Sequence, residues 1–264
     1  MAASSFFAAL MFYAGAMYAS AYYAYFRVQA FSLGFSFFEL VLQSLRLITM
    51  PVLITMALAV LAPKLPELLA SLGVPRRPVL LAQRAGRTLA GLHPLIVLAG
   101  ICLMALWPYI QPYRWAAPVL VASGLLLGQT RAAQQPPRPS SGWRSGLPIA
   151  IAGLFLIWAV ALAAGQQGRQ EAEKTADLLV RRTAVVLLST ERLAMSGPSG
   201  LRSEDLGEGQ HYRYRYSGLR LLVERDKRYY LLPLGWQYRT DSTYVIEDDD
   251  SIRVELYPGT QPPP

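Results

Sequence analysis

The sequence predicts an α-helical membrane domain of about five transmembrane helices, followed by a small, mainly antiparallel β domain. Three observations support this fold class. Apolar residues make up 53% of the 264 residues and charged residues 16%, which is too apolar for an ordinary soluble domain. Long apolar runs fill residues 1–165, whereas shorter alternating segments fill the remainder. Residues 1–165 also hold 11 basic and 2 acidic side chains, whereas residues 166–264 hold 14 basic and 15 acidic ones.

Run length decides which segments are expected to span. A helix needs about 20 apolar residues to cross the roughly 30 Å hydrocarbon layer. The fourth run has 14 uninterrupted apolar residues, so it spans only if it extends back through Tyr113, with Arg114 reaching the interface. For the first run, a cleavable signal peptide is the disfavoured alternative, because no basic residue precedes it. The expected spans are residues 5–26, 37–62, 88–110, 113–129 and 147–165.

Basic residues between the apolar runs predict the orientation. Eight of the eleven basic residues before residue 166 lie in two connecting segments, and such segments stay in the cytoplasm. We therefore expect a multi-pass protein of the cytoplasmic membrane, with its N-terminus inside and its C-terminal domain extracytoplasmic. Positive charge placed in these loops indicates contact with lipid headgroups and not with nucleic acid. The eight residues are Lys64, Arg76, Arg77, Arg84, Arg87, Arg131, Arg138 and Arg144.

The hydrophobic period changes after residue 165. Residues 166–182 are expected to form a juxtamembrane helix that prolongs the fifth span. Alternating segments then predict an extracytoplasmic β domain over residues 183–258, a meander of about five strands. We expect a tight turn at Asp226 and Lys227, a long loop over residues 190–210, and a hairpin whose turn is the acidic run before Ile252. The tail, residues 259–264, is expected to be disordered.

Three polar residues within the expected spans are candidate functional residues. Arg46 would lie about 14 Å deep if the span begins at Phe37, where an unpaired charge costs at least about 2.5–3.5 kcal/mol. It would then mark a polar pathway or a subunit contact. Alternatively, the span begins later and Arg46 reaches the headgroups. Glu39 shares its helix face about 10 Å away along the axis. His93 is either a proton relay or an interfacial polar group.

The alternating segment Tyr212, Arg213, Tyr214, Arg215 and Tyr216 is the candidate partner-binding strand. Its cations and aromatic rings are also the chemistry of nucleic-acid stacking. The near-neutral charge of the domain and its expected location outside the cell favour a half-buried strand, with tyrosines packed inward and arginines outward.

Catalytic and metal-binding patterns are not found in the sequence. Two histidines and one cysteine, Cys102, cannot supply a zinc site or a Cys/His dyad. The acidic run of residues 247–250 lacks the spacing and the glycine of a calcium loop. Phosphate-binding loops, dinucleotide fingerprints and nucleophile elbows are also missing from the sequence. We therefore expect a protein that is not an enzyme and has no metal or cofactor.

Two parts of the chain carry a resemblance to a protein family. Residues 22–45, YYAYFRVQAFSLGFSFFELVLQSL, resemble the first membrane hairpin of small multi-pass membrane proteins from high-GC actinobacteria. Residues 214–233, YRYSGLRLLVERDKRYYLLP, and residues 248–256, DDDSIRVEL, are similar to the small C-terminal β domain attached to some of them. The resemblance implies a bacterial source and a location in the cell membrane. It implies no activity, because the function of these relatives is not established.

Two functional hypotheses follow. The first is a non-enzymatic membrane anchor whose extracytoplasmic β domain binds an envelope ligand or another membrane or envelope protein, with sheet edges available to a partner strand. The second is a subunit of an oligomeric transporter or channel, with a polar route at Arg46, Glu39 and His93. Five spans without an internal repeat disfavour a stand-alone transporter. The sequence does not predict the oligomeric state.

Overall fold

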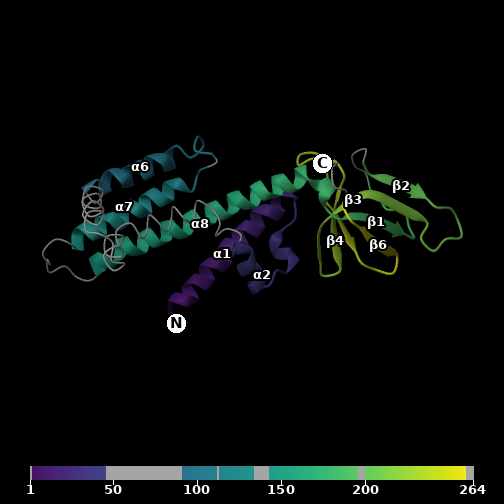
Figure 1. The fold of residues 1–264 in the computed structure, drawn as a ribbon, viewed down its shortest axis with the longest axis horizontal. Helices are drawn as coiled ribbons and strands as arrows, with labels where there is room; N and C mark the ends of the chain where they lie inside the picture. The colour runs from purple at the N-terminus through teal and green to yellow at the C-terminus, as the bar shows by residue number, and fades with distance from the viewer. Residues whose placement is uncertain (1, 46–90, 112, 134–142, 196–199, 260–264) are drawn as a thin grey trace, which may run out of the picture. The chain divides into compact units, whose positions relative to one another are not determined.

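The computed structural model describes residues 2–45, 91–111, 113–133, 143–195 and 200–259 (Figure 1). The chain divides into two compact units. The first comprises Met1–Tyr18 and Phe37–Gln166, and the second comprises Ala19–Ser36 and Gln167–Pro264. Helices precede a small antiparallel sheet at the C-terminal end, which confirms the coarse fold class predicted from the sequence.

The described part of the first unit is mainly helical. Its packing depends on glycines that let helices approach closely. A Cβ atom on Gly100 of α6 would lie 2.6 Å from Val121 of α7, and one on Gly124 of α7 would lie 2.6 Å from Val97 of α6. The helices that contribute to this unit are α1 (Ala2–Tyr25), α2 (Phe37–Leu45), α6 (His93–Ala105), α7 (Ala116–Ala133) and α8 (Trp143–Asp177).

Among the described residues, one helix is long and apolar enough to cross a membrane, and five were expected. That helix is Gly146–Asp177 within α8, with a mean hydropathy of 2.4 over its most apolar window. The expected span at residues 88–110 is a helix of only 13 residues in the described part of the chain. It is short because Pro94 lies in its first turn and a loop begins at Leu106. Much of the expected 37–62 span lies outside the described residues.

Helix α8 joins two segments that the sequence analysis separated. It runs for 35 residues without a break, through the expected fifth span and most of the expected juxtamembrane helix. Its last turns carry the exposed ion pairs Arg169–Glu173 and Lys174–Glu171, which stabilise a helix in water. The short helix η3 (Leu179–Arg181) follows and leads into the sheet.

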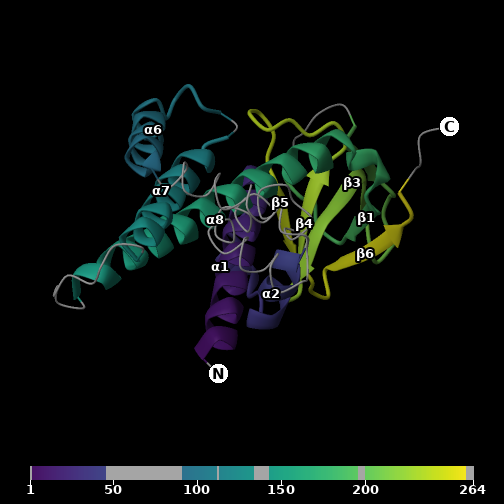
Figure 2. The ribbon, with the colours of Figure 1, turned by 60° about the vertical axis from the view of Figure 1, so that its left-hand side comes forward.

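The second unit contains a six-stranded antiparallel sheet of order β5-β4-β3-β1-β6, with β2 also paired to β3 (Figure 2). The expected simple meander is wrong, because β1 lies between β3 and β6. The loop expected over residues 190–210 contains β2, and two expected strands merge into the long β3. The strands are β1 (Ala184–Ser189), β2 (Arg202–Asp205), β3 (Tyr214–Arg225), β4 (Arg228–Pro233), β5 (Tyr244–Glu247) and β6 (Ile252–Tyr257).

Gly218 divides the long strand β3 into two pairing regions. On one side β3 pairs with β2 up to Ser217 and with β4 from Leu219 onward. Gly218 has a φ of 85°, and the Leu234 N–H donates to its carbonyl oxygen at 2.7 Å. A Cβ atom here would collide with the carbonyl oxygen of Gly200. Only glycine combines this backbone conformation with this close approach.

The sequence predicted the turn between β3 and β4 correctly but not the path of the chain between β5 and β6. Asp226 and Lys227 join β3 to β4 with φ values of 49° and 58°, so the predicted tight turn is confirmed. The predicted acidic hairpin is wrong, because β5 and β6 lie at opposite edges of the sheet and do not pair. The connection from Glu247 to Ile252 spans at most about 18 Å when fully extended. Crossing a flat sheet of this width already needs about 19 Å, so the sheet must curve.

Both faces of the sheet are covered. On one face, side chains from the strands form a core of their own: Val185, Leu187, Tyr216, Leu219 and Leu231. On the other face, residues of α1 and of the following segment, residues 26–34, pack with α8 and η3 against the strands and the loop after β4. This second core consists of Tyr22, Phe26, Val28, Leu33, Ala172, Leu179, Leu222, Tyr230, Leu232 and Trp236. Residues 19–36, which the sequence analysis placed in or beside the membrane, are therefore part of the β unit.

Candidate functional site

The site begins at the C-terminal end of α1. The Val28 N–H donates to the Tyr23 carbonyl and the Arg27 N–H to the Ala24 carbonyl, both at 3.0 Å. This pattern ends a helix by a left-handed residue, usually glycine. Here Arg27 takes that conformation, with a φ of 61°, at a cost of about 1–2 kcal/mol. The short helix η1 (Ala30–Leu33) follows. We call residues 26–34 the elbow.

Hydrogen bonds fix the elbow to the loop that precedes β5. The Arg27 guanidinium donates to the carbonyl oxygens of Tyr238 and Arg239, both at 3.2 Å. The Thr243 hydroxyl donates to the Phe26 carbonyl at 2.5 Å, and the ring of Tyr238 stacks on Tyr25 with centroids 4.6 Å apart. Arg27 therefore holds this loop in place, which offsets the cost of its backbone conformation.

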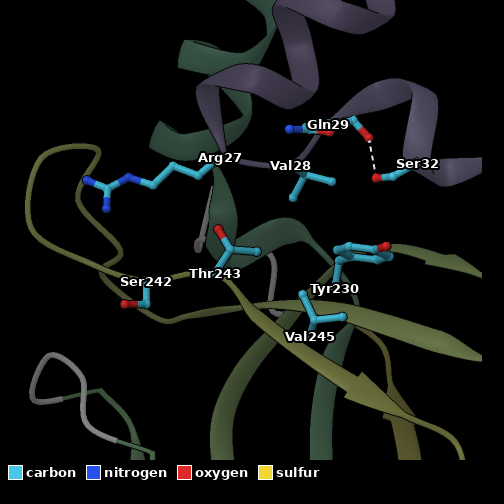
Figure 3. A pocket seen from close by; sticks show the side chains of 8 residues that line it. All are labelled: Arg27, Val28, Gln29, Ser32, Tyr230, Ser242, Thr243 and Val245. Atoms are coloured by element: carbon cyan, nitrogen blue, oxygen red, sulfur yellow. Dashed lines mark hydrogen bonds between the residues drawn. The ribbon is translucent and has the colours of Figure 1, made fainter.

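An open pocket of about 540 Å³ lies between the elbow and the sheet (Figure 3). In Figure 3, Gln29 and Ser32 lie above the pocket and Tyr230 and Val245 lie below it. A second depression of about 330 Å³ lies beside it and shares three of its residues. The larger pocket is lined by Arg27, Val28, Gln29, Ser32, Tyr230, Ser242, Thr243 and Val245.

The polar groups in the larger pocket are hydrogen-bond donors and acceptors. Gln29 supplies an amide, Arg27 a guanidinium, and Ser32 and Ser242 supply hydroxyls, of which the Ser32 hydroxyl donates to the Gln29 carbonyl at 2.7 Å. The residues that line it include no Asp, Glu, His or Cys. Within the described residues, no group of three or more His, Cys, Asp or Glu side chains is placed to hold a metal ion. The pocket can orient a polar ligand by hydrogen bonds.

Arg220 is a buried cation that the sequence analysis missed. Arg220 is 7% exposed. Within the described chain, its Nη1 donates a hydrogen bond to the Leu219 carbonyl at 3.0 Å. Its Nε is buried without a partner there. Burial lowers the pKa of Arg220. Arg220 lies opposite Leu232 of β4, on the face of the sheet that α1, α8 and η3 cover.

Of the candidate segment Tyr212–Tyr216, residues 214–216 begin β3 in the middle of the sheet, and Tyr212 and Arg213 precede the strand. Tyr216 is buried and Arg215 is exposed, as the alternation predicted. The Tyr216 hydroxyl accepts a bond from the Leu193 N–H at 2.7 Å. From Tyr214 onward the strand pairs with β1 on one side and β2 on the other, so its backbone offers no free edge for a partner strand.

The arginines of this strand are paired with acidic residues of β2. Arg213 Nε lies 3.1 Å from Asp205 Oδ1, and Arg213 Nη2 lies 3.1 Å from Asp205 Oδ2. Arg215 forms an ion pair with Glu204 at 3.6 Å. The bond from Arg213 holds the pKa of Asp205 below its ordinary value. These contacts tie β2 to β3, so the arginines already have partners within the chain.

The three candidate intramembrane residues have different outcomes. Arg46 lies outside the described residues. Glu39 lies in the first turn of α2 and is half-buried. His93 begins α6, where its ring lies close enough to Gly128 of α7 that an added Cβ atom would be 3.0 Å from Cδ2. Glu39 and His93 thus lie on different helices, and a polar route through the three residues stays a prediction.

Comparisons with protein-family models, with curated proteins and with solved structures found no match to this chain.

Proposed function

We propose that this protein is a non-enzymatic anchor of the cytoplasmic membrane, and that its helices present the C-terminal β unit on the extracytoplasmic side. There, the pocket at the elbow binds a polar envelope ligand or an exposed polar group of an envelope protein. The proposal includes all five expected spans. One of them corresponds to the membrane-capable helix found among the described residues, and the other four are part of the proposal.

The continuity of α8 is the observation that carries this proposal. At 1.5 Å per residue, its 35 residues extend about 52 Å, which exceeds the roughly 30 Å hydrocarbon layer. Only 28% of its most apolar window is buried within the protein, whereas the core helix of a soluble protein is mostly buried. Leu154 in this segment is 67% exposed. An apolar helix with an uncovered surface suits lipid, and its charged final turns suit water.

Orientation follows from the basic connecting segments, which remain on the cytoplasmic side. Since the C-terminal unit follows the last expected span, it then lies on the opposite side. Its own charge is near neutral, with 14 basic and 15 acidic residues after residue 165, which argues against nucleic acid as its ligand.

Two measurements in cells test the proposal. Extraction with alkaline carbonate should leave the full chain in the membrane pellet, because integral proteins resist this treatment, and its release to the supernatant would contradict membrane anchoring. A photo-reactive amino acid in place of Ser242, in the pocket, should then form a defined adduct with an envelope component. Glu208, whose side chain is 90% exposed outside the pocket, is the matched control position. Equal adducts from both positions, or none from Ser242, would refute ligand binding by the pocket.

The transporter hypothesis has its own test. Arg46→Leu should leave solute flux in proteoliposomes unchanged if the protein is an anchor. Loss of flux by a variant that still folds would favour the transporter.

A further inference from the structure

The sheet has three strands with an open edge in the described structure, and they differ in what they offer. β2 has four residues, all exposed, and three of them are charged. β5 has four residues. β6 has six residues and pairs only with β1. Short, charged edges are protected against pairing, so β6 is the edge best suited to accept another strand.

The free backbone groups of β6 follow from its pairing with β1. The Ser251 carbonyl accepts a bond from the Thr190 N–H at 3.0 Å, so Ser251 directs its backbone groups toward β1. In an antiparallel strand these groups alternate in direction. Val254 and Leu256 therefore direct their N–H and C=O groups outward, away from β1.

The side chains of β6 are arranged so that the strand is complementary to itself. Apolar Ile252, Val254 and Leu256 share one face, and Arg253 and Glu255 lie on the other. We propose that β6 pairs antiparallel with β6 of a second copy of this chain, with Val254 of one copy opposite Val254 of the other. Within each copy Arg253 Nε lies 3.4 Å from Glu255 Oε1. In this register Arg253 of each copy also faces Glu255 of the second copy, and Ile252 faces Leu256 of the second copy.

Other registers lack this match. Centring the pair on Glu255 or on Arg253 places like charges directly opposite each other, which is destabilising. A shift by one residue places apolar side chains opposite charged ones and directs backbone groups of one strand away from their acceptors. Only the register centred on Val254 pairs opposite charges and covers Leu256, which is 51% exposed in the single chain.

The ends of β6 limit which groups take part in this pairing. The Ile252 N–H already donates to the Asp249 carbonyl at 3.2 Å, so Val254 and Leu256 supply the N–H donors between the two copies. Pro258, which has no N–H to donate, falls just beyond the paired segment. The acidic residues Asp248–Asp250 of one copy then lie beside the chain after Tyr257 of the second copy, and not beside their own counterparts. The proposal is therefore a two-fold symmetric dimer that extends the sheet across both copies.

Charge reversal is the first test, with the purified full chain in mild detergent. Arg253→Glu places two like-charged pairs across the two-fold axis, so the dimer dissociation constant should rise about tenfold or more. Glu255→Arg should do the same, and the double variant R253E/E255R should restore the dimer. Arg228→Glu reverses an exposed pair with Glu247 on β4 and β5, 3.1 Å apart, and should leave the dimer unchanged. A monomeric wild type, or a double variant no better than the single ones, would overturn the proposal.

Disulfide cross-linking is the second test and does not depend on charge. Directly opposite residues in a hydrogen-bonded antiparallel pair have Cα atoms about 5.5 Å apart, within the range of a disulfide. In a Cys102→Ser background, Val254→Cys should therefore cross-link two copies under mild oxidation. Val245→Cys lies on β5, where the native residue is 51% exposed and therefore accessible to oxidation. It is the control and should not cross-link. Cross-linking through residue 245 but not through residue 254 would overturn the assignment to β6.

Discussion

Replacing Phe26 by alanine should destabilise the β unit, although Phe26 lies about 160 residues before the first strand in sequence. Its side chain is fully buried. Its ring centroid lies 5.3 Å from that of Trp236 and 5.5 Å from that of Tyr22. Truncating a buried phenylalanine costs about 3–5 kcal/mol, and a whole domain is stable by about 5–15 kcal/mol. Phe26→Ala should therefore remove a large part of the stability of the unit.

Hydrogen exchange in the full chain measures this effect where it should occur. The amides of β3 and β4 should lose about 3–5 kcal/mol of protection in Phe26→Ala. Phe31→Ala is the matched control, because Phe31 lies on the same elbow but is 74% exposed; its effect should stay within about 0.5 kcal/mol. Equal protection of β3 and β4 in the two variants would refute the conclusion that the elbow belongs to the core of the β unit.

Three further predictions follow from the same structure. The isolated fragment 183–258 should not fold as a unit, because without residues 19–36 it loses four buried side chains worth about 1.5–3 kcal/mol each. Thermal unfolding followed by circular dichroism should therefore show no cooperative transition, and a cooperative transition would contradict this. Gly218→Ala should destabilise the sheet by more than about 1 kcal/mol in urea unfolding, since alanine at positive φ is strained and its Cβ would meet the Gly200 carbonyl; an unchanged midpoint would count against it. Arg213 lowers the pKa of Asp205 in the folded state. This pair should therefore stabilise β2 above about pH 3.9 and lose its effect as the pH falls through the lower folded pKa of Asp205. The hydrogen-exchange protection of β2 should show this loss in the wild type and not in Arg213→Gln.

Local features of the sequence predicted several elements well. The alternation over residues 252–257 matches β6 residue for residue, and Asp226 and Lys227 form the predicted turn. The apolar run at 147–165 lies within the one membrane-capable helix of the described chain. Each of these signals arises from neighbouring residues, because strand period, turn conformation and helix length are local properties.

Features that depend on distant parts of the chain were not predictable. The acidic run at residues 247–250 joins two alternating strands and therefore resembled a hairpin turn, yet its flanking strands pair with β4 and β1. The burial of Arg220 gave no signal in the sequence, because the segments that cover its face of the sheet, residues 19–36 and α8, are distant from it in the chain. The elbow pocket was missed for the same reason, since its residues come from two segments about 200 positions apart. The left-handed Arg27 gave no signal, because glycine is the residue that marks such positions.

Labelling of a single cysteine in intact cells tests the central claim most directly. Residue 208 is suited to this, since the Glu208 side chain is 90% exposed and lies in the β unit. In a Cys102→Ser background, Glu208→Cys should react with a membrane-impermeant maleimide added to intact cells, because the β unit is proposed to lie outside the cytoplasm. Labelling that occurs only after the cells are lysed would place the unit in the cytoplasm and contradict the account.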